Sequence, residues 1–193
     1  MSIKDNLPIV AFISQDEWES WLREQHTESN GLWLKIAKKG SGNDSVTYAE
    51  ALDVALCYGW IDGQKGAFDG HWWLQRFTPR RARSRWSKVN TTHVERLIAE
   101  GRMQPAGLLE VERAKADGRW DAAYEAQSSA TVPDDLQAAL DENEAARGFF
   151  ATLNSANRYA IIYRVQDAKR PETRARRIRT FVEMLSEGKI LFP

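Results

Sequence analysis

The stretch Tyr58-Gly59-Trp60-Ile61-Asp62-Gly63 marks the change from a helix to a strand in the first half of the chain. Before it, residues 51–58 are apolar nearly all round, which is typical of a buried helix. The first glycine of the stretch suits the position that follows a helix C-terminus. After the stretch, the apolar run at 71–78 predicts a hairpin with Ile61 that turns across residues 63–70. The pattern therefore predicts a buried helix that leads directly into an antiparallel hairpin.

The residues before this stretch alternate between strand and helix signals. An apolar run at 8–12 predicts a first strand, and residues 32–37 show the two-residue alternation of a half-buried strand. A capping-box pattern, in which Ser or Thr is followed three residues later by Glu, occurs at Ser14 and again at Thr47. Each capping box predicts the start of a helix, so the first third of the chain mixes strands and helices.

From residue 87 onward the apolar spacing changes to the 3.6-residue period of helices. The segment 121–132 is small and polar, and it predicts a linker. We therefore expect an α+β fold, in which a small antiparallel sheet with packed helices is followed by a helical C-terminal portion. The expected domains are an α+β domain at residues 1–120, with the aromatic and arginine motif, and a helical region at residues 131–193 that packs on it.

Length and composition fit an ordinary globular protein. The chain has 193 residues, of which 42% are hydrophobic and 28% charged, so it is long enough to bury a sizeable core. Its formal net charge is zero, which excludes an overall field that attracts nucleic acid or a membrane. The N-terminus lacks the apolar run of a signal peptide, and no segment approaches the roughly 20 apolar residues that span a bilayer. We expect a soluble, cytoplasmic protein without membrane insertion, and the oligomeric state stays open.

The residues with catalytic or metal-binding chemistry are sparse. Cys57 is the only cysteine and lies late in the apolar helix, where a thiol is more often a packing group than a nucleophile. The three histidines are far apart in the sequence and show no metal-site spacing. We therefore expect no metal and no cofactor, and we assign no catalytic residue. An enzyme that uses Asp62 or Tyr58 for acid–base chemistry stays open as an alternative.

Aromatic and basic side chains concentrate between residues 60 and 86, where four of the eight tryptophans lie. Arg76 shares a strand face with Trp72 and Leu74, so its charge must be paired or reach water. Asp62 is the natural partner if the two hairpin strands are adjacent. Two interpretations follow. Either the Asp62–Arg76 pair only fixes the register of the hairpin, or Arg76 binds an anion between aromatic walls.

The basic segment 76–88 offers a second functional interpretation. It carries six Lys and Arg residues, and no acid occurs between Asp69 and Glu95. Basic residues mixed with an aromatic such as Trp86 can bind phosphates and stack on bases. The segment therefore keeps a nucleic-acid-binding module open, against the simpler interpretation of a solvated loop.

A further basic cluster lies at the start of the last helix. Lys169 and Arg174 have no obvious local partner there, and they could extend towards the aromatic residues of the first domain.

Four sequence blocks, at 58–63, 75–80, 86–90 and 168–174, make the chain similar to the YdeI/OmpD-associated family, which contains the OmdA domain and is often labelled bacteriocin-protection. The resemblance covers most of the chain. It implies an association with envelope stress and an outer-membrane porin, and it implies no particular reaction.

Taken together, these patterns favour a non-enzymatic protein that binds a small anionic or sugar-like ligand, with a role in stress or bacteriocin tolerance implied by the resemblance. In this interpretation Arg76 is the anion partner and the indole rings form the walls. The expected ligand-binding residues are Tyr58, Trp60, Asp62, Arg76, Arg80, Trp86, Lys169 and Arg174.

Overall fold

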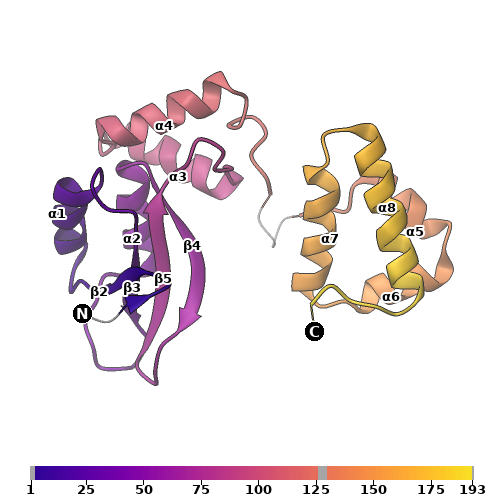
Figure 1. Cartoon of the computed structure of the whole chain (residues 1–193), viewed down its shortest axis with the longest axis horizontal. Helices are drawn as coiled ribbons and strands as arrows, with labels where there is room; N and C mark the ends of the chain where they lie inside the picture. The colour runs from indigo at the N-terminus through magenta and orange to yellow at the C-terminus, as the bar shows by residue number, and fades with distance from the viewer. Residues whose placement is uncertain (1–2, 126–129, 193) are drawn as a thin grey trace. The chain divides into compact units, whose positions relative to one another are not determined.

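The structure is a computed structural model that describes residues 3–125 and 130–192. The chain folds into two compact units, Met1–Ala123 and Tyr124–Pro193 (Figure 1). Part of the predicted linker, residues 126–129, lies outside the described residues.

The N-terminal unit is built on a five-stranded sheet with the strand order β1-β2-β3-β5-β4. Most neighbours are antiparallel, but β2 and β3 are parallel because helix α1 connects them, and a parallel pair needs such a crossover. The predicted α+β class is confirmed, and the sheet is mixed rather than wholly antiparallel. The strands are β1 (Ile3–Lys4), β2 (Leu7–Ala11), β3 (Leu32–Ala37), β4 (Trp60–Ala67) and β5 (Trp72–Pro79).

Capping side chains start three of the four helices of this unit. Ser14, Thr47 and Ser87 each accept a hydrogen bond from the backbone N–H three residues later, and Thr47 completes the capping box with its glutamate. The fourth helix begins with Pro105 in its first turn. The helices are α1 (Gln15–Gln25), α2 (Tyr48–Cys57), α3 (Lys88–Ala99) and α4 (Pro105–Ala116).

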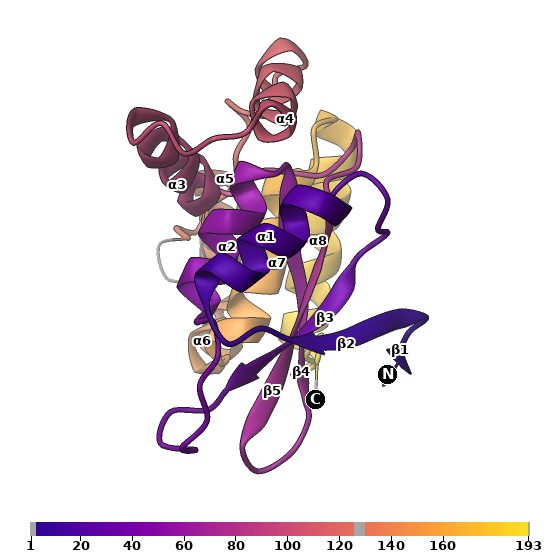
Figure 2. The ribbon, with the colours of Figure 1, turned by 90° about the vertical axis from the view of Figure 1, so that its left-hand side faces the viewer.

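The two faces of the sheet have different surroundings. Figures 1 and 2 show α1 and α2 against one face, which we call the inner face. Side chains such as Leu34 and Phe77 point from this face into the main core, where they meet Trp18 of α1. On the opposite, outer face, Leu7, Trp33 and Leu74 form a small cluster of their own. Side chains alternate between the two faces along each strand, so adjacent residues of one strand lie in different surroundings, one towards the helices and the next on the outer face.

Two glycines allow helices α2 and α4 to approach at the level of their backbones. A Cβ atom on Gly107 of α4 would lie 2.2 Å from the Cys57 carbonyl oxygen at the end of α2. Gly59 has φ +74°, and a Cβ there would lie 2.9 Å from the Ala106 carbonyl oxygen. Gly59 is therefore required both by its left-handed backbone and by the close contact with α4.

The described elements of the C-terminal unit are all helices: α5 (Asp134–Asp141), α6 (Glu144–Thr152), α7 (Ser155–Asp167) and α8 (Pro171–Ser186). Their core includes Leu136, Phe150, Ile161 and Phe181. Among the described residues of the chain, none of the helices has the length and apolar character needed to cross a membrane.

Candidate functional site

Two of the predicted ligand-binding residues, Tyr58 and Trp60, point into the main core. Trp60 is only 1% exposed, and its indole N–H donates a hydrogen bond of 3.2 Å to the His26 carbonyl oxygen. The Tyr58 hydroxyl donates to Glu19 at 3.5 Å, and burial raises the pKa of this hydroxyl. These contacts explain both residues as parts of the helix–sheet core.

Arg80 and Trp86 form a buried stack. The guanidinium carbon of Arg80 lies 3.4 Å from the centre of the Trp86 ring, and Trp86 packs in turn on Trp120 with the ring centres 4.9 Å apart. Arg80 also donates to the Arg85 carbonyl oxygen at 3.2 Å. Arg80 is 7% exposed and Trp86 is 2% exposed, so this stack links the end of β5 to the segment that leads into α3.

Asp62 and Arg76 lie on opposite faces of the sheet, and the ion pair expected between them does not form among the described residues. In the hairpin register Asp62 is opposite Phe77 on the inner face, whereas Arg76 is opposite Trp33 on the outer face. An offset of one residue in a strand moves a side chain to the other face. Asp62 instead accepts a hydrogen bond of 2.8 Å from the hydroxyl of Tyr48.

Arg76 belongs to a group of cations and aromatics on the outer face, which we call the outer-face cluster: Lys4, Trp33, Lys35 and Arg76. The ammonium nitrogen of Lys4 lies 4.2 Å from the centre of the Trp33 ring. The ammonium of Lys35 lies 4.6 Å from the centre of the Trp72 ring. The outer-face strand positions of β1 to β5 hold no acidic residue, although the charge of Lys35 also acts on the carboxylate of Asp69 in the turn between β4 and β5.

The outer-face cluster contains two buried donors that have no acceptor. Trp33 Nε1 and Arg76 Nε are both buried, and neither makes a hydrogen bond in the structure. The two residues face each other across β3 and β5, where Cβ atoms are typically about 4.5–5.5 Å apart. An unsatisfied buried donor costs about 1–3 kcal/mol. Because both groups can only donate, an oxygen acceptor between them would satisfy both.

Sequence reasoning missed the other members of this cluster. Trp33 is 1% exposed and is one of the buried residues of the unit, but the alternation at 32–37 places Leu32, Leu34 and Ile36 on one face and Trp33 with Lys35 on the other. The same alternation was therefore the signal that could have found them. Lys4 belongs to a two-residue strand that carries no recognisable pattern.

Arg174, another predicted residue, has a partner within its own unit. Its guanidinium donates two hydrogen bonds to the Asp135 carboxylate, at 2.5 and 2.8 Å, and one of 3.0 Å to the Val165 carbonyl oxygen. The hydrogen bonds from Arg174 lower the pKa of Asp135. The two residues are 39 positions apart, so no local pattern could reveal the pair. Lys169 is exposed just before α8.

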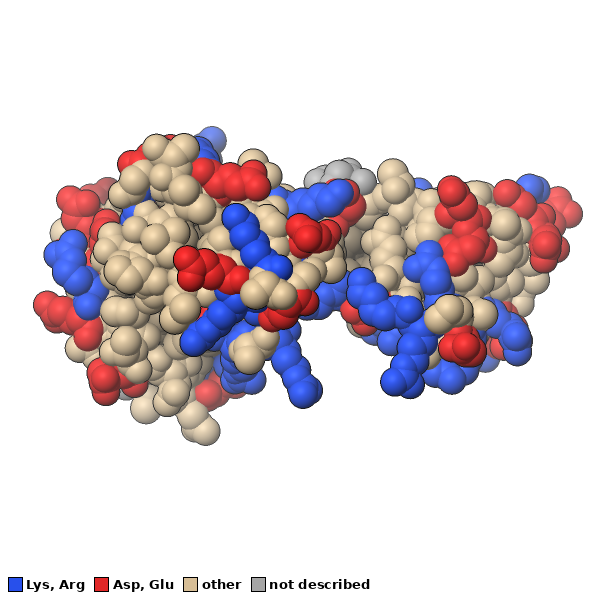
Figure 3. All heavy atoms as spheres, turned by 90° about the horizontal axis from the view of Figure 1, so that it is seen from above, with Lys and Arg blue, Asp and Glu red and all other residues tan. Residues whose placement is uncertain are grey.

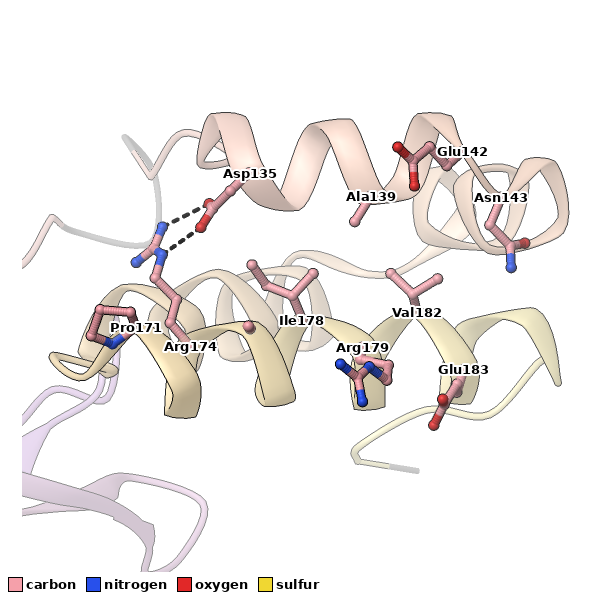
Figure 4. Close-up of a pocket in the computed structure, with 11 residues that line it drawn as sticks. Asp135, Ala139, Glu142, Asn143, Pro171, Arg174, Ile178, Arg179, Val182 and Glu183 are labelled. Atoms are coloured by element: carbon pink, nitrogen blue, oxygen red, sulfur yellow. Dashed lines mark hydrogen bonds and ion pairs between the residues drawn. The ribbon is translucent and has the colours of Figure 1, made fainter.

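The Arg174–Asp135 pair closes one end of a groove between α5 and α8 (Figure 4). The groove has a volume of about 600 Å³, and Ala139, Ile178 and Val182 form its apolar floor. Glu142 and Glu183 lie towards its other end (Figure 4).

A polar network joins α2 to α3. His93 and Arg96 contact the two carboxylate oxygens of Asp53 at 2.8 and 2.5 Å. Burial alone would raise the pKa of Asp53, but the hydrogen bonds from His93 and Arg96 outweigh it and lower this pKa. Within residues 3–125 and 130–192, no group of three or more His, Cys, Asp or Glu side chains is placed to hold a metal ion.

Cys57 is expected to react slowly with thiol reagents in the folded protein. Its side chain is 3% exposed, and burial raises the pKa of its thiol to about 11. Since the thiolate is the reactive species, the two-unit rise from 9.0 lowers its population about 100-fold near neutral pH. We expect labelling by a disulfide reagent to be at least about 100-fold slower in the native state than in urea. Equal rates in the two states would show that the thiol is accessible and activated.

Acidic and basic side chains are interspersed on the surface. Figure 3 shows Lys and Arg beside Asp and Glu on the visible face of each unit. Within the basic segment 76–88, Arg81, Arg83 and Lys88 are exposed, whereas Arg80 is buried in its stack.

Comparisons with known proteins find two family models along the chain. The first, described as a domain of unknown function (DUF8412), matches residues 10–110, which is more than half of the chain. The second, described as "Bacteriocin-protection, YdeI or OmpD-Associated" (OmdA), matches residues 129–188. Only one block that carried the resemblance, 168–174, lies within the OmdA match, and the other three lie within the first match. No curated protein and no solved structure gives a significant match.

Proposed function

Because the chain belongs to the DUF8412 family and carries an OmdA domain after it, and neither description assigns a reaction, we propose from its geometry that it is a binding protein for a small anionic ligand. The proposed site is the outer-face cluster. The observation that carries the proposal is the pair of facing, buried donors, Trp33 Nε1 and Arg76 Nε, neither of which has an acceptor.

The charges around this pair favour an anion over a neutral ligand. Lys4 and Lys35 add two positive charges to that of Arg76 on a sheet face whose strand positions carry no acid. An anion at this face gains attraction from all three side chains, while a sugar without charge would gain only hydrogen bonds and stacking. Lys4 lies over the ring face of Trp33, which leaves the buried indole N–H as the group of this residue that lacks a partner.

The chemistry of the donors points to a carboxylate or phosphate group. One oxygen of such a group can accept a hydrogen bond from Trp33 Nε1 while another oxygen of the same group accepts from the guanidinium of Arg76. Both a planar carboxylate and a tetrahedral phosphate carry more than one oxygen, so either can bridge the two donors. The aliphatic stem of Arg76 lies beside Gly63, where an added Cβ would be at contact distance, 3.7 Å, from Cβ and Cδ of Arg76. The OmdA description supports a role for such binding in bacteriocin tolerance.

The test is a thermal-shift and calorimetric titration of the full chain with inorganic phosphate, acetate, citrate, sugar phosphates and short oligonucleotides. We expect at least one small anion to stabilise the wild type, by about 2.7 kcal/mol at 100 times its Kd. Arg76→Ala should weaken that binding at least about tenfold, and Trp33→Phe, which removes only the N–H donor and part of the ring area, should weaken it about tenfold. Arg81→Ala is the matched control, since Arg81 is exposed and lies in the same basic segment.

Two results would contradict the proposal. One is that no small anion on the panel stabilises the wild type. The other is that Arg81→Ala weakens binding as much as Arg76→Ala does. If only oligonucleotides bind, with an affinity that falls steeply with salt and depends on Arg81 and Arg83, the nucleic-acid-binding alternative replaces it.

A further inference from the structure

A hollow that is separate from the outer-face cluster lies on the inner face of the sheet, at the turn end of the β4–β5 hairpin. Two cavities of about 590 and 420 Å³ adjoin there, and both are lined by Lys38, Lys39 and Trp73. Lys65 lines the first cavity and Tyr48 lines the second. We call these five residues together the Trp73 hollow.

Among the described helices of the N-terminal unit, none covers this end of the hairpin, which leaves the hollow open. Helix α2 begins only at Tyr48, and the connection that precedes it, residues 38–47, runs opposite the hairpin instead (Figure 2). Both ends of this connection are fixed. The backbone N–H of Ala37 donates to the Ser45 hydroxyl at 2.9 Å, and the ammonium of Lys38 donates to the Asp69 carbonyl oxygen in the hairpin turn at 2.7 Å. These hydrogen bonds tie the connection to β3 and to the hairpin turn, and so fix the two sides of the hollow relative to each other.

Two aromatic rings form the wall of the hollow. The rings of Tyr48 and Trp73 have centres 6.1 Å apart and planes inclined by 47°. The hydroxyl of Tyr48 is held by Asp62 at 2.8 Å, which fixes the orientation of its ring. Trp73 is half-buried, and its inner part packs on the main core. The rings are thus pre-positioned to contact an aromatic ligand.

Three lysines line the hollow beside these rings. The ammonium of Lys65 lies 4.2 Å from the centre of the Trp73 ring, Lys38 and Lys39 line the same cavity, and the ammonium of Lys38 is held by the Asp69 carbonyl oxygen. Within the described parts of the chain, none of these three lysines forms an ion pair with a carboxylate. The larger cavity has no acidic residue in its lining, whereas Asp44 lines the second, so the positive charge is concentrated on the side of Lys65.

We propose that the Trp73 hollow binds a nucleoside phosphate. The base would lie against Trp73 and Tyr48, and the phosphate would be bound by Lys39 and Lys65, whose flexible stems let the ammonium groups follow the ligand. A cavity of about 590 Å³ falls in the range of about 300–1,000 Å³ that is typical of small-ligand sites. The ligand is either a free nucleotide or one nucleotide unit of a single strand, since both present the same base and phosphate.

The test is a fluorescence-anisotropy titration of the full chain with a fluorescently labelled adenosine monophosphate at about 0.1 M salt. We expect saturable binding to the wild type, competed by unlabelled adenosine monophosphate and far less by adenosine. The double substitution Lys39→Ala with Lys65→Ala should weaken binding at least about tenfold, because it removes both phosphate contacts. Trp73→Phe should weaken it several-fold, because the stacking surface shrinks.

The controls separate this site from others on the molecule. Lys115→Ala removes a lysine that also lies over an indole, 5.2 Å from the centre of Trp120, and should leave binding unchanged. Arg76→Ala is titrated in parallel: binding that is lost with the lysine pair and not with Arg76 assigns the ligand to this hollow, whereas the reverse assigns it to the outer-face cluster. An oligonucleotide of thymidines that binds more tightly through the same lysines would identify a single strand as the source. The proposal is overturned if labelled adenosine monophosphate does not bind at millimolar concentration, or if the double substitution binds it as well as the wild type.

Discussion

Replacement of Gly107 by alanine is expected to destabilise the N-terminal unit by about 3 kcal/mol or more. The new Cβ would lie 2.2 Å from the carbonyl oxygen of Cys57 and 2.8 Å from that of Leu56. These are backbone atoms at the end of α2, so they can only yield if one helix moves away from the other. All eight tryptophans lie between residues 18 and 120, so urea unfolding followed by tryptophan fluorescence reports this unit alone.

Gly70→Ala is the matched control for this prediction. It lies in the same unit, in the turn of the hairpin, and a Cβ there would meet no atom within 4 Å. We expect a change of less than about 0.5 kcal/mol. If Gly107→Ala unfolds at the same urea concentration as Gly70→Ala, α4 does not contact α2 through its backbone.

Replacement of Arg80 by alanine is expected to cost about 3 kcal/mol of stability, the second-largest effect that we predict. The substitution empties the space under Trp86 and removes a guanidinium only 3.4 Å from the ring centre, in a site where Arg80 is 7% exposed. Arg80→Lys should recover only part of the loss, since an ammonium cannot stack as a planar group. The same urea titration measures both variants.

The neighbouring Arg81→Ala is the control for Arg80, because Arg81 is exposed and its substitution should change stability by less than about 0.5 kcal/mol. A contrary outcome would be an Arg80→Ala protein as stable as Arg81→Ala that no longer binds the small anion of the proposed function. That result would move Arg80 from the core to the ligand site.

Local patterns predicted the elements of the fold well. The Ser14 and Thr47 patterns act over a few residues, and each precedes a helix as predicted. The hairpin is also present, but its turn was wrongly placed across residues 63–70, since β4 continues to Ala67 and the turn lies at 68–71. Long-range features were not accessible in this way. The parallel pairing of β2 with β3 and the Arg174–Asp135 pair join distant residues, and no short motif encodes them.

The candidate site shows the same division between features that local patterns predict and features that depend on how distant residues come together. Arg76 was identified because an arginine on an apolar strand needs an explanation, and the structure shows its Nε buried without an acceptor. The expected link to Asp62 was wrong, because it depended on the hairpin register to a single residue, which composition does not specify. The place of Arg80 beneath Trp86 depends on how a loop folds back, and strand alternation contains no information about loops.

The β4–β5 hairpin contributes Arg76 to the outer-face cluster on one face and Lys65 and Trp73 to the hollow on the other, so its register matters as much as its composition. Arg76 and its neighbour Gln75 point to opposite faces, and the same is true of each adjacent pair along the strand. Insertion of one residue in the middle of β5, between Gln75 and Arg76, would exchange the faces of the side chains on one side of the insertion while leaving the amino-acid content almost unaltered. The hairpin keeps its two faces only where such an extra residue is absorbed by a bulge, as the irregularity between Asp62 and Lys65 of β4 does.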